Sequence, residues 1–278
     1  MKTQMYYNLP YDEKVASILK EHKIKYKYYD FNSGIGEAYP HMSFYLFKED
    51  AVWDVLKNIL PKKDVHSLVF TDEELLSAKW LTVRSTNMKI DSLNEDTYDY
   101  FCPGEKDKSK RYGAHQRQIA PFEFRPIKWK NNNHFYSCYH GGYYTIFCDD
   151  LAKQFIEDNG FAGMRFDDII WHKKHCILPD AHQMVFATVL PREAIVLDDH
   201  VWEVACKGCG KIQYAYTRDF RLGIKESYLS ENIDFYSTPT MFGEGGVYQL
   251  SIASQRVYRA LKEQRMTRNL CFEPILLY

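Results

Sequence analysis

Two stretches of the chain follow one pattern: GGYYTIFCDDLAKQFIEDNGFAGMRFDDII at residues 141–170 and GGVYQLSIASQRVYRALKEQRMTRNLCFEPIL at residues 245–276. A shift of 104 residues superposes the Gly-Gly pairs and places Tyr144 on Tyr248. A shift of 106 residues aligns the later apolar positions: Leu151 with Val257, Phe155 with Leu261, Met164 with Leu270, Phe166 with Phe272 and Ile169 with Ile275. These matches favour an internal duplication over a chance similarity of two unrelated units.

Each stretch predicts a strand, a helix and a closing strand. Asp149 or Asp150 precedes the first helix and Ser254 precedes the second, and such side chains cap the exposed N–H groups of a helix start. The aligned apolar residues then recur at helical spacing, so one face of each helix is expected to pack on a sheet. The closing strands alternate apolar and polar residues, which predicts one buried face.

The N-terminal part has helix and strand signals of its own. Residues 11–22 predict a helix that starts near Asp12, residues 24–31 predict a strand, and residues 49–60 predict a second helix. The residues expected to face inward on this second helix are Val52, Trp53, Leu56, Ile59 and Leu60. A further strand is predicted at residues 80–86.

These elements predict the α+β class, with mixed sheets, packed helices and two related strand-helix-strand lobes after an N-terminal α+β segment. The polar stretch at residues 94–110 is the best candidate for a linker. We therefore expect an N-terminal segment at 1–95, a first lobe with a degenerate cysteine knuckle at 96–180, and a second lobe with a CxxC knuckle and the C-terminal strand-helix-strand unit at 181–278.

The composition limits the classes of partner. Aromatic residues make up 16% of the chain, with 22 Tyr and 17 Phe, which suits thick mixed cores or a surface that faces another protein. The formal net charge of −1 gives no broad attraction for nucleic acid or anionic lipid. No apolar run approaches the roughly 20 residues of a membrane span, and the N-terminus lacks the apolar core of a signal peptide. A cytoplasmic location, away from membranes and nucleic acid, is expected.

The sharpest local motif is Cys206-Lys-Gly-Cys209-Gly210. Two thiolates across a tight turn, with glycine for left-handed angles, form the half-site geometry used for Zn²⁺. Strand-like residues at 201–204 and 212–216 flank the motif and predict a hairpin knuckle. A thioredoxin-type redox pair would instead begin a helix. Cys206 and Cys209 are therefore candidate zinc ligands, and a metal-free hairpin is the alternative.

Further ligands for a zinc ion are not obvious, because the chain has no second CxxC. The nearest supply is His172, His175 and Cys176, with His182 and His200 further along. All seven Cys, an odd number, are expected to be reduced thiols.

Enzyme motifs are scarce. The chain has no P-loop, no G-x-G-x-x-G, no H-E-x-x-H and no nucleophile elbow. Asp167-Asp168 and Asp198-Asp199 are paired only in sequence, since neighbours on a strand point to opposite faces. A Cys-His dyad remains an alternative. The sequence predicts a protein that is not an enzyme.

From about Asp72 onward the chain resembles the bacterial double-CXXCG motif proteins, which include immunity proteins of contact-dependent and polymorphic toxin systems. Only one of the two CXXCG motifs is retained here. The segments that carry the resemblance are ELLSAKWL at 74–81, Cys102-Pro103, QIAPFEF at 118–124, IKW at 127–129, CKGCGK at 206–211, DFY at 234–236, Phe242-Gly243, Ser254-x-x-Val257-Tyr-x-x-Leu261 and LCFEP at 270–274.

The resemblance implies an immunity or antitoxin role, in which the chain binds a cognate toxin domain stoichiometrically and neutralises it without catalysis. A zinc-knuckle interaction or regulatory module without a toxin partner is the alternative function. Neither the resemblance nor the composition identifies the toxin, the surface that binds it or the oligomeric state.

Overall fold

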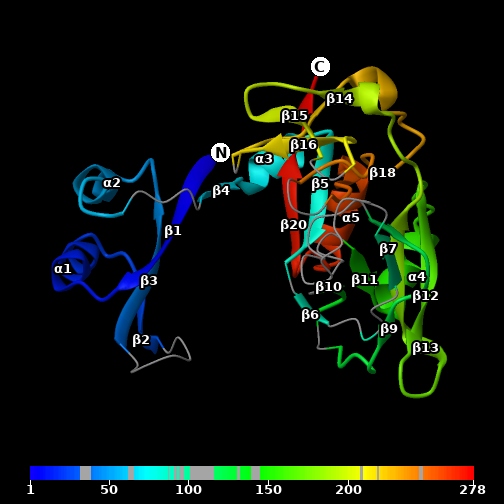
Figure 1. Cartoon of the computed structure of the whole chain (residues 1–278), viewed down its shortest axis with the longest axis horizontal. Coiled ribbons are helices and arrows are strands. Elements are labelled where there is room, and N and C mark those ends of the chain that lie inside the picture. Colours follow the sequence, from blue (N-terminus) through cyan, green and yellow to red (C-terminus); the bar gives the residue numbers. More distant parts are fainter. Residues whose placement is uncertain are drawn as a thin grey trace. The chain divides into compact units, whose positions relative to one another are not determined.

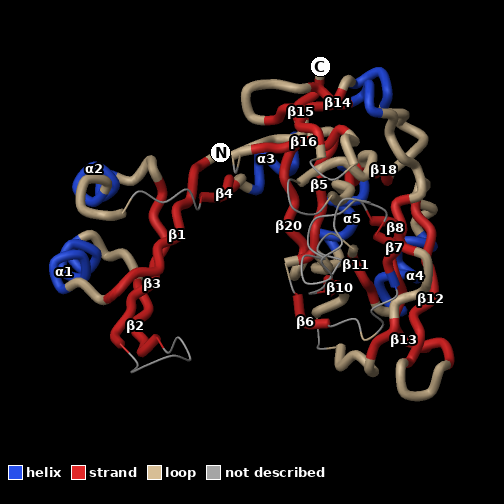
Figure 2. Tube along the Cα trace, in the orientation of Figure 1, coloured by secondary structure: helices blue, strands red, loops and turns tan. Residues whose placement is uncertain are grey.

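The structure is a computed structural model of the chain. It describes residues 1–31, 39–61, 66–86, 88–90, 93, 97–100, 116–129, 132–138, 145–206, 209–217, 219–243 and 247–278. Antiparallel and mixed sheets combine with short helices, which confirms the predicted α+β class (Figures 1 and 2). The chain forms two compact units: unit 1 is Met1–Asp72 with Thr217–Phe220, and unit 2 is Glu73–Tyr216 with Arg221–Tyr278.

Unit 1 is an antiparallel sheet with helices on one face. Its elements are β1 (Lys2–Pro10), α1 (Glu13–Glu21), β2 (Tyr26–Phe31), β3 (Tyr39–Phe47), α2 (Ala51–Leu56) and β4 (His66–Val69). The strand order is β2-β3-β1-β4. The predicted start of α1 is confirmed, because the Asp12 carboxylate accepts a hydrogen bond from the Val15 N–H at 3.0 Å. The apolar faces of both helices pack on Met5, Tyr7, Met42 and Phe44 of the sheet (Figure 1).

For one residue of unit 1, the predicted inward-facing position is wrong. Val52, Leu56 and Leu60 are buried, whereas Ile59 is 39% exposed. The helix α2 ends at Leu56, and a turn follows, so the helical periodicity no longer carries Ile59 toward the sheet. The Leu60 N–H still reaches the Leu56 carbonyl at 2.8 Å, which returns Leu60 to the core.

Unit 2 contains both copies of the repeat. The first copy consists of β10 (Phe135–Cys138), β11 (Ile146–Cys148), α4 (Asp150–Asp158) and β12 (Met164–Trp171). The second copy consists of β18 (Phe235–Ser237), β19 (Ser251–Ser254), α5 (Gln255–Glu263) and β20 (Leu270–Pro274). The strand-helix-strand order predicted for each copy is therefore present. The Gly-Gly pairs and Tyr144, which belong to the predicted alignment, lie outside the described residues.

A fourth strand completes each copy from elsewhere in the sequence. In the first copy β13 (Cys176–Phe186) lies between β11 and β12, and in the second copy β5 (Trp80–Ser85) lies between β19 and β20. Both inserted strands are antiparallel to their two neighbours. The strand β5 thus precedes the first copy along the chain but completes the sheet of the second.

The two copies match in register. Phe135 lies opposite Cys148, and Phe235 lies opposite the equivalent Ala253. In the closing strands Met164 pairs with Phe186, and Leu270 pairs with Ser85. Apolar residues of both helices and both sheets form a single core, so the copies fold against each other.

The alignment of the two helices needs a correction. Their N-caps, Asp149 and Ser254, differ by 105 residues rather than 106. The buried pairs are therefore Ala152 with Val257 and Ile156 with Leu261, while Leu151, expected on the buried face, is 67% exposed. The extra residue of the second copy enters after the helix, which is why a shift of 106 holds only for the closing strands.

Smaller elements surround the two copies. They are α3 (Asp72–Ser77), β6 (Met88–Ile90), β7 (Tyr98–Tyr100), β8 (Gln116–Gln118), β9 (Glu123–Phe124), β14 (Ile195–Val196), β15 (Val201–Ala205), β16 (Ile212–Tyr216), β17 (Gly223–Ile224), β21 (Leu276–Leu277) and short 3-10 turns at Arg192–Ala194 and Glu226–Tyr228. β6 and β9 extend the sheet of the first copy at its two edges.

The predicted segments 1–95, 96–180 and 181–278 stay a prediction. Their first boundary falls on residues 94–96, which lie outside the described residues. Across the described part of the chain, no helix combines the length and the apolar character needed to cross a membrane.

Candidate functional site

The predicted cysteine knuckle is the turn of the β15–β16 hairpin. The two strands pair antiparallel from Val201–Tyr216 to Ala205–Ile212. The Cys206 N–H donates to the Lys211 carbonyl at 2.8 Å, and the Gly210 N–H donates to the Cys206 carbonyl at 2.8 Å. Gly210 has φ +72°, the left-handed angle that glycine adopts without a Cβ penalty. The turn is therefore closed by backbone hydrogen bonds.

The turn offers only half of the ligands of a structural zinc site. Cys206 and Cys209 supply two sulfur ligands, whereas a structural zinc needs four ligands. Within the described ranges no group of three or more His, Cys, Asp or Glu side chains is placed to hold a metal ion. Cys102 lies outside those ranges. Cys206 and Cys209 as zinc ligands stay a prediction.

Two of the four histidines considered as further ligands have other contacts. His172 Nδ1 lies 2.7 Å from Glu123 Oε2, at the start of the β12–β13 turn. His182 Nε2 lies 2.7 Å from Asp150 Oδ1, at the start of α4. Each of these histidines belongs to the first copy, whereas the cysteine knuckle belongs to a separate two-stranded sheet.

Chelation is expected to remove zinc from the protein without unfolding it. Because β15 and β16 hold the turn through backbone hydrogen bonds, loss of the metal should lower the Tm by less than about 2 °C. A metal assay with and without EDTA, followed by thermal melting, measures this. The variant Cys206→Ser/Cys209→Ser should lose the bound zinc, and Cys271→Ser, at a cysteine of β20 that was not considered as a ligand, is the control. A drop of about 10 °C or more would instead indicate a closed structural site.

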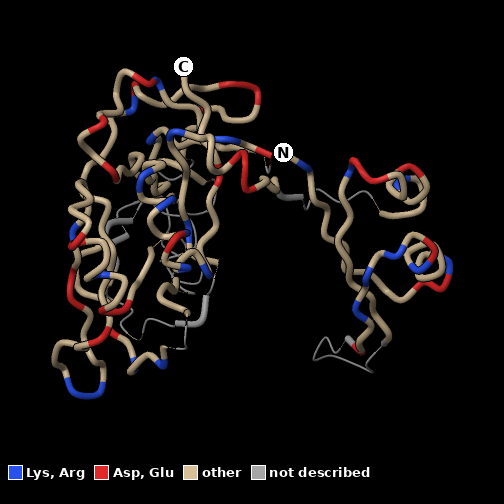
Figure 3. The backbone as a smooth tube through the Cα atoms, turned by 180° about the vertical axis from the view of Figure 1, so that it is seen from behind, with Lys and Arg blue, Asp and Glu red and all other residues tan. Residues whose placement is uncertain are grey.

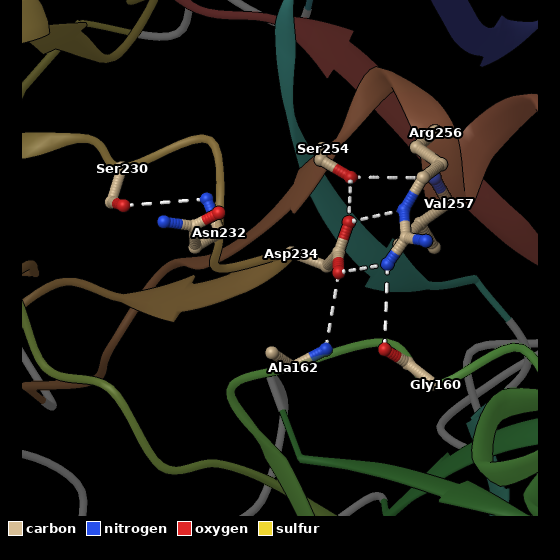
Figure 4. A network of polar contacts seen from close by, with 8 residues as sticks. All are labelled: Gly160, Ala162, Ser230, Asn232, Asp234, Ser254, Arg256 and Val257. Atoms are coloured by element: carbon tan, nitrogen blue, oxygen red, sulfur yellow. Dashed lines mark hydrogen bonds and ion pairs between the residues drawn. The ribbon is translucent and has the colours of Figure 1, made fainter.

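A buried carboxylate, Asp234, joins the two copies (Figure 4). It accepts hydrogen bonds from Ser254 Oγ at 2.7 Å and from Arg256 Nε and Nη2 at 3.0 and 2.6 Å, all within the second copy. It also accepts one from the Ala162 N–H of the first copy at 3.1 Å. The Arg256 guanidinium lies 4.7 Å from the centre of the Phe161 ring. The cluster therefore connects the turn after α4, in the first copy, to the start of α5, in the second copy.

The ionisation of Asp234 follows from these contacts. Burial by itself would raise the pKa of its carboxyl, but hydrogen bonds from Arg256, Ser254 and the Ala162 N–H lower the pKa overall. The hydrogen bond to Asp234 in turn raises the pKa of Arg256. Both partners stay charged, and the cluster acts as a structural ion pair rather than as a proton donor.

The first copy holds a chemically different pair at the equivalent place. His134 Nδ1 lies 2.8 Å from Asp149 Oδ2, and Asp149 Oδ1 caps α4 by accepting the Ala152 N–H at 2.9 Å. In both copies the residue before the first strand contacts the N-cap residue of the helix. The sequence contains a signal for this equivalence, since Phe-Tyr-Ser occurs at 135–137 and again at 235–237, a shift of 100 residues that the predicted alignment missed.

Cys148 and His182, which are neighbours in the sheet, do not support a cysteine-based nucleophile. Cys148 lies directly opposite His182 in the β11–β13 ladder. Burial raises the pKa of the Cys148 thiol well above its usual value, and the charge of Asp149 raises it further. A thiol held protonated in a core is a poor nucleophile.

The open face of unit 1 is the surface of its sheet opposite α1 and α2. Tyr6 pairs with Tyr45 across β1 and β3, and their ring centroids are 5.0 Å apart. The Tyr29 hydroxyl donates to Asn8 Oδ1 at 2.7 Å, and His41 is buried beside the Tyr29 ring. These side chains alternate with the core residues of the same strands, so they point away from the helices.

Among the described side chains of this open face, Tyr45 is the most exposed aromatic one, at 57%. Lys2 Nζ lies 5.4 Å from the centre of the neighbouring Phe47 ring. This face was not predicted because β1 was not recognised as a strand: the polar run Lys2-Thr-Gln and the run Met5-Tyr-Tyr do not alternate, and only the burial in the folded chain does. The available signal was one tyrosine on the same face of each of three neighbouring strands: Tyr6 in β1, Tyr29 in β2 and Tyr45 in β3.

Comparisons with known proteins do not name a family. No protein-family model matches the chain, and no match was found among curated protein sequences. The resemblance to the double-CXXCG proteins therefore stays a prediction.

Proposed function

We propose that the chain is an immunity or antitoxin-type protein that binds and neutralises a cognate bacterial toxin domain in the cytoplasm, without catalysis, through a stoichiometric protein–protein interface. The observation that carries the proposal is the open face of unit 1. Its aromatic side chains lie on a hydrogen-bonded sheet that is covered by helices only on the opposite side.

The composition of the open face suits an interface. Tyrosine provides large contact area at low entropic cost, and its hydroxyl keeps the face compatible with water before the partner binds. The side chains are also ordered, because Tyr6 packs on Tyr45 and the Tyr29 hydroxyl donates a hydrogen bond to Asn8. Because they are ordered before binding, little side-chain entropy is lost on association. This supports a tight complex built on one face of a sheet.

Replacing Tyr45 by alanine is expected to weaken toxin binding at least about tenfold, because truncation of a central aromatic anchor costs on the order of 1–2 kcal/mol or more. Tyr28→Ala is the matched control. Tyr28 is 59% exposed, close to the 57% of Tyr45, but it pairs with the buried Met42 and lies on the helix side of the sheet. Its replacement should change the Kd less than about threefold.

The measurement uses the product of the adjacent reading frame. Co-expression, co-purification and a growth assay test whether that product binds the chain and is less toxic in its presence, and titration then gives the Kd of each variant. If that product neither binds nor loses toxicity, the proposed function fails. If it binds and both tyrosine variants behave alike, the interface lies elsewhere on the molecule.

The second candidate function is a zinc-knuckle interaction or regulatory module without a toxin partner. The observation that favours it is the β15–β16 turn, which has the backbone of a zinc half-site. A partner that binds only when Cys206 and Cys209 are intact, together with an adjacent product that does not bind, would favour this candidate over toxin neutralisation.

A further inference from the structure

The β12–β13 hairpin ends in four consecutive basic or titratable residues, His172, Lys173, Lys174 and His175, here called the hairpin tip. All four are exposed. The tip closes at the Trp171–Cys176 pair of the ladder, and it carries Lys but neither Asp nor Glu (Figure 3). In Figures 1 and 2 the hairpin extends beyond the ends of the neighbouring strands of its sheet.

Backbone geometry fixes the shape of the tip. The N–H groups of Lys174 and His175 both donate to the Trp171 carbonyl, at 3.1 and 2.8 Å. His175 has φ +50°, the left-handed residue that reverses the chain. Two side chains are also held: His172 Nδ1 lies 2.7 Å from Glu123 Oε2, and Lys174 Nζ lies 4.0 Å from the centre of the Trp171 ring. The tip is therefore ordered without a partner.

The lysines of the tip have no carboxylate partner among the described residues. Glu123 contacts His172, but in the part of the chain that the structure describes no carboxylate forms an ion pair with Lys173, Lys174 or Arg125. Arg125 follows Phe124, whose carbonyl accepts the His172 N–H at 2.9 Å, so its backbone runs beside the tip. Lys173 and Lys174, without an ion-pair partner among the described residues, thus lie together at the tip of this hairpin, in a chain whose formal net charge is −1.

Apolar side chains accompany these cations. Ile177 is 54% exposed and Cys176 is also exposed, both directly after the tip. Exposed lysines next to an exposed apolar side chain match a concave protein surface. In such a surface, ion pairs are partly desolvated and apolar contacts add buried area. A polyanion such as duplex nucleic acid is a poorer match, because its tight binding rests on contacts with many phosphates.

We infer that the hairpin tip docks into an acidic pocket on the toxin domain, with Lys173 and Lys174 as the contacting cations. This inference rests on the proposed function and adds the chemistry of the partner surface. The tip steers association electrostatically.

The test reverses the charge of the tip. Binding of the adjacent-frame product to the full chain is measured for Lys173→Glu/Lys174→Glu at 50 and 300 mM salt. The control, Lys14→Glu/Lys20→Glu, reverses two exposed lysines on α1. We expect the tip variant to bind at least tenfold more weakly at low salt and to lose most of the salt dependence, because surface ion pairs are screened. The control should stay within about threefold of the unmodified protein.

A conservative variant separates charge from folding. Lys173→Arg/Lys174→Arg should keep the affinity within threefold, and all variants should melt at the same temperature because the tip lies outside the core. If the adjacent product binds and charge reversal at the tip leaves its affinity unchanged, the inference is overturned while the proposed function stands.

A second experiment tests the inference if the adjacent product does not bind and the proposed function has therefore failed. A decaglutamate peptide and a 20-base-pair RNA duplex are then titrated into the chain. Binding of the peptide that is lost in the charge-reversed tip variant supports a site for an acidic protein segment. Peptide binding that survives charge reversal, absence of peptide binding, or tighter, tip-dependent binding of the duplex overturns the inference.

Discussion

Replacing Gly163 by alanine is expected to destabilise the protein by about 3–5 kcal/mol, because the new Cβ would have no room. A Cβ built at Gly163 lies 2.2 Å from the Phe235 carbonyl oxygen, a backbone atom that no rotamer change can move. Gly163 also has φ +94°, an angle that strains residues with a side chain. Relief of the clash requires the first copy to separate from the start of β18 in the second.

This separation would break a set of backbone hydrogen bonds. The Ala162 carbonyl accepts the N–H groups of both Asp234 and Phe235 at 2.9 Å. The Ala187 N–H donates to the Gly163 carbonyl at 2.9 Å within the first copy, so Gly163 itself is held at this contact. Urea denaturation gives the free energy of unfolding of the variant and of its control, and the two results distinguish a clash from simple backbone strain.

Gly160→Ala is the matched control for this prediction. Gly160 lies three residues earlier and also has a positive φ, +61°, but a Cβ there would meet no atom within 4 Å. Its replacement should cost only about 1 kcal/mol, from backbone strain. Equal losses of stability in the two variants would show that the contact between the copies at Gly163 is not as close as described.

Replacing Asp234 by alanine is the second large effect, with an expected loss of about 2–4 kcal/mol. The substitution leaves the Ser254 hydroxyl and the Ala162 N–H without their acceptor and removes the partner of Arg256. The cost stays below that of a fully buried pair because the Arg256 side chain is 58% exposed. Thermal and urea unfolding measure the loss.

The control for Asp234 is Asp167→Ala. Asp167 also accepts two hydrogen bonds from one arginine, Arg165 Nε at 3.0 Å and Nη2 at 3.2 Å, but this pair is exposed at the surface. Its loss should cost less than about 0.5–1 kcal/mol, the usual contribution of an exposed ion pair. A similar cost at both positions would argue against a structural role for the Asp234 cluster.

The Asp234 cluster also predicts a dependence on pH. Because the folded protein lowers the pKa of Asp234, the cluster stabilises the fold fully above the unfolded value of about 4 and loses this contribution as pH falls through the lower, folded pKa. Asp234→Asn has no charge to titrate there. The stability difference between the unmodified protein and Asp234→Asn should therefore shrink as urea unfolding is repeated from pH 5 to pH 2, and a constant difference would contradict the assignment.

Elements set by local chemistry could be predicted from the sequence. The caps Asp12, Asp149 and Ser254 lie at the starts of α1, α4 and α5, where their side chains accept backbone N–H groups. The hairpin around Cys206 and Cys209 was predicted from a glycine in a tight turn between two strand-like segments. A cap or a tight turn depends on residues within a few positions, so its signal is complete in a short window.

Errors in the prediction came from single-residue shifts that a local pattern does not resolve. Leu151 and Ala152 both follow the polar residues that begin α4, and only the choice between Asp149 and Asp150 as the cap decides which of them faces the core. Ile59 was placed inward on the assumption that α2 continued to Leu60, whereas it ends earlier. Helix ends depend on tertiary packing as well as on propensity.

The sequence by itself determined the α+β class, the caps of the helices, the cysteine hairpin and the presence of a repeated strand-helix-strand unit. The tertiary structure alone decided that β5 completes the second copy, that Asp234 connects the two copies, and that Tyr6, Tyr29 and Tyr45 share the face of the unit 1 sheet opposite α1 and α2. A strand carries the same alternation whichever strand it pairs with. Its partner is chosen by the total burial and hydrogen bonding gained across more than a hundred residues of intervening chain, which no local pattern records.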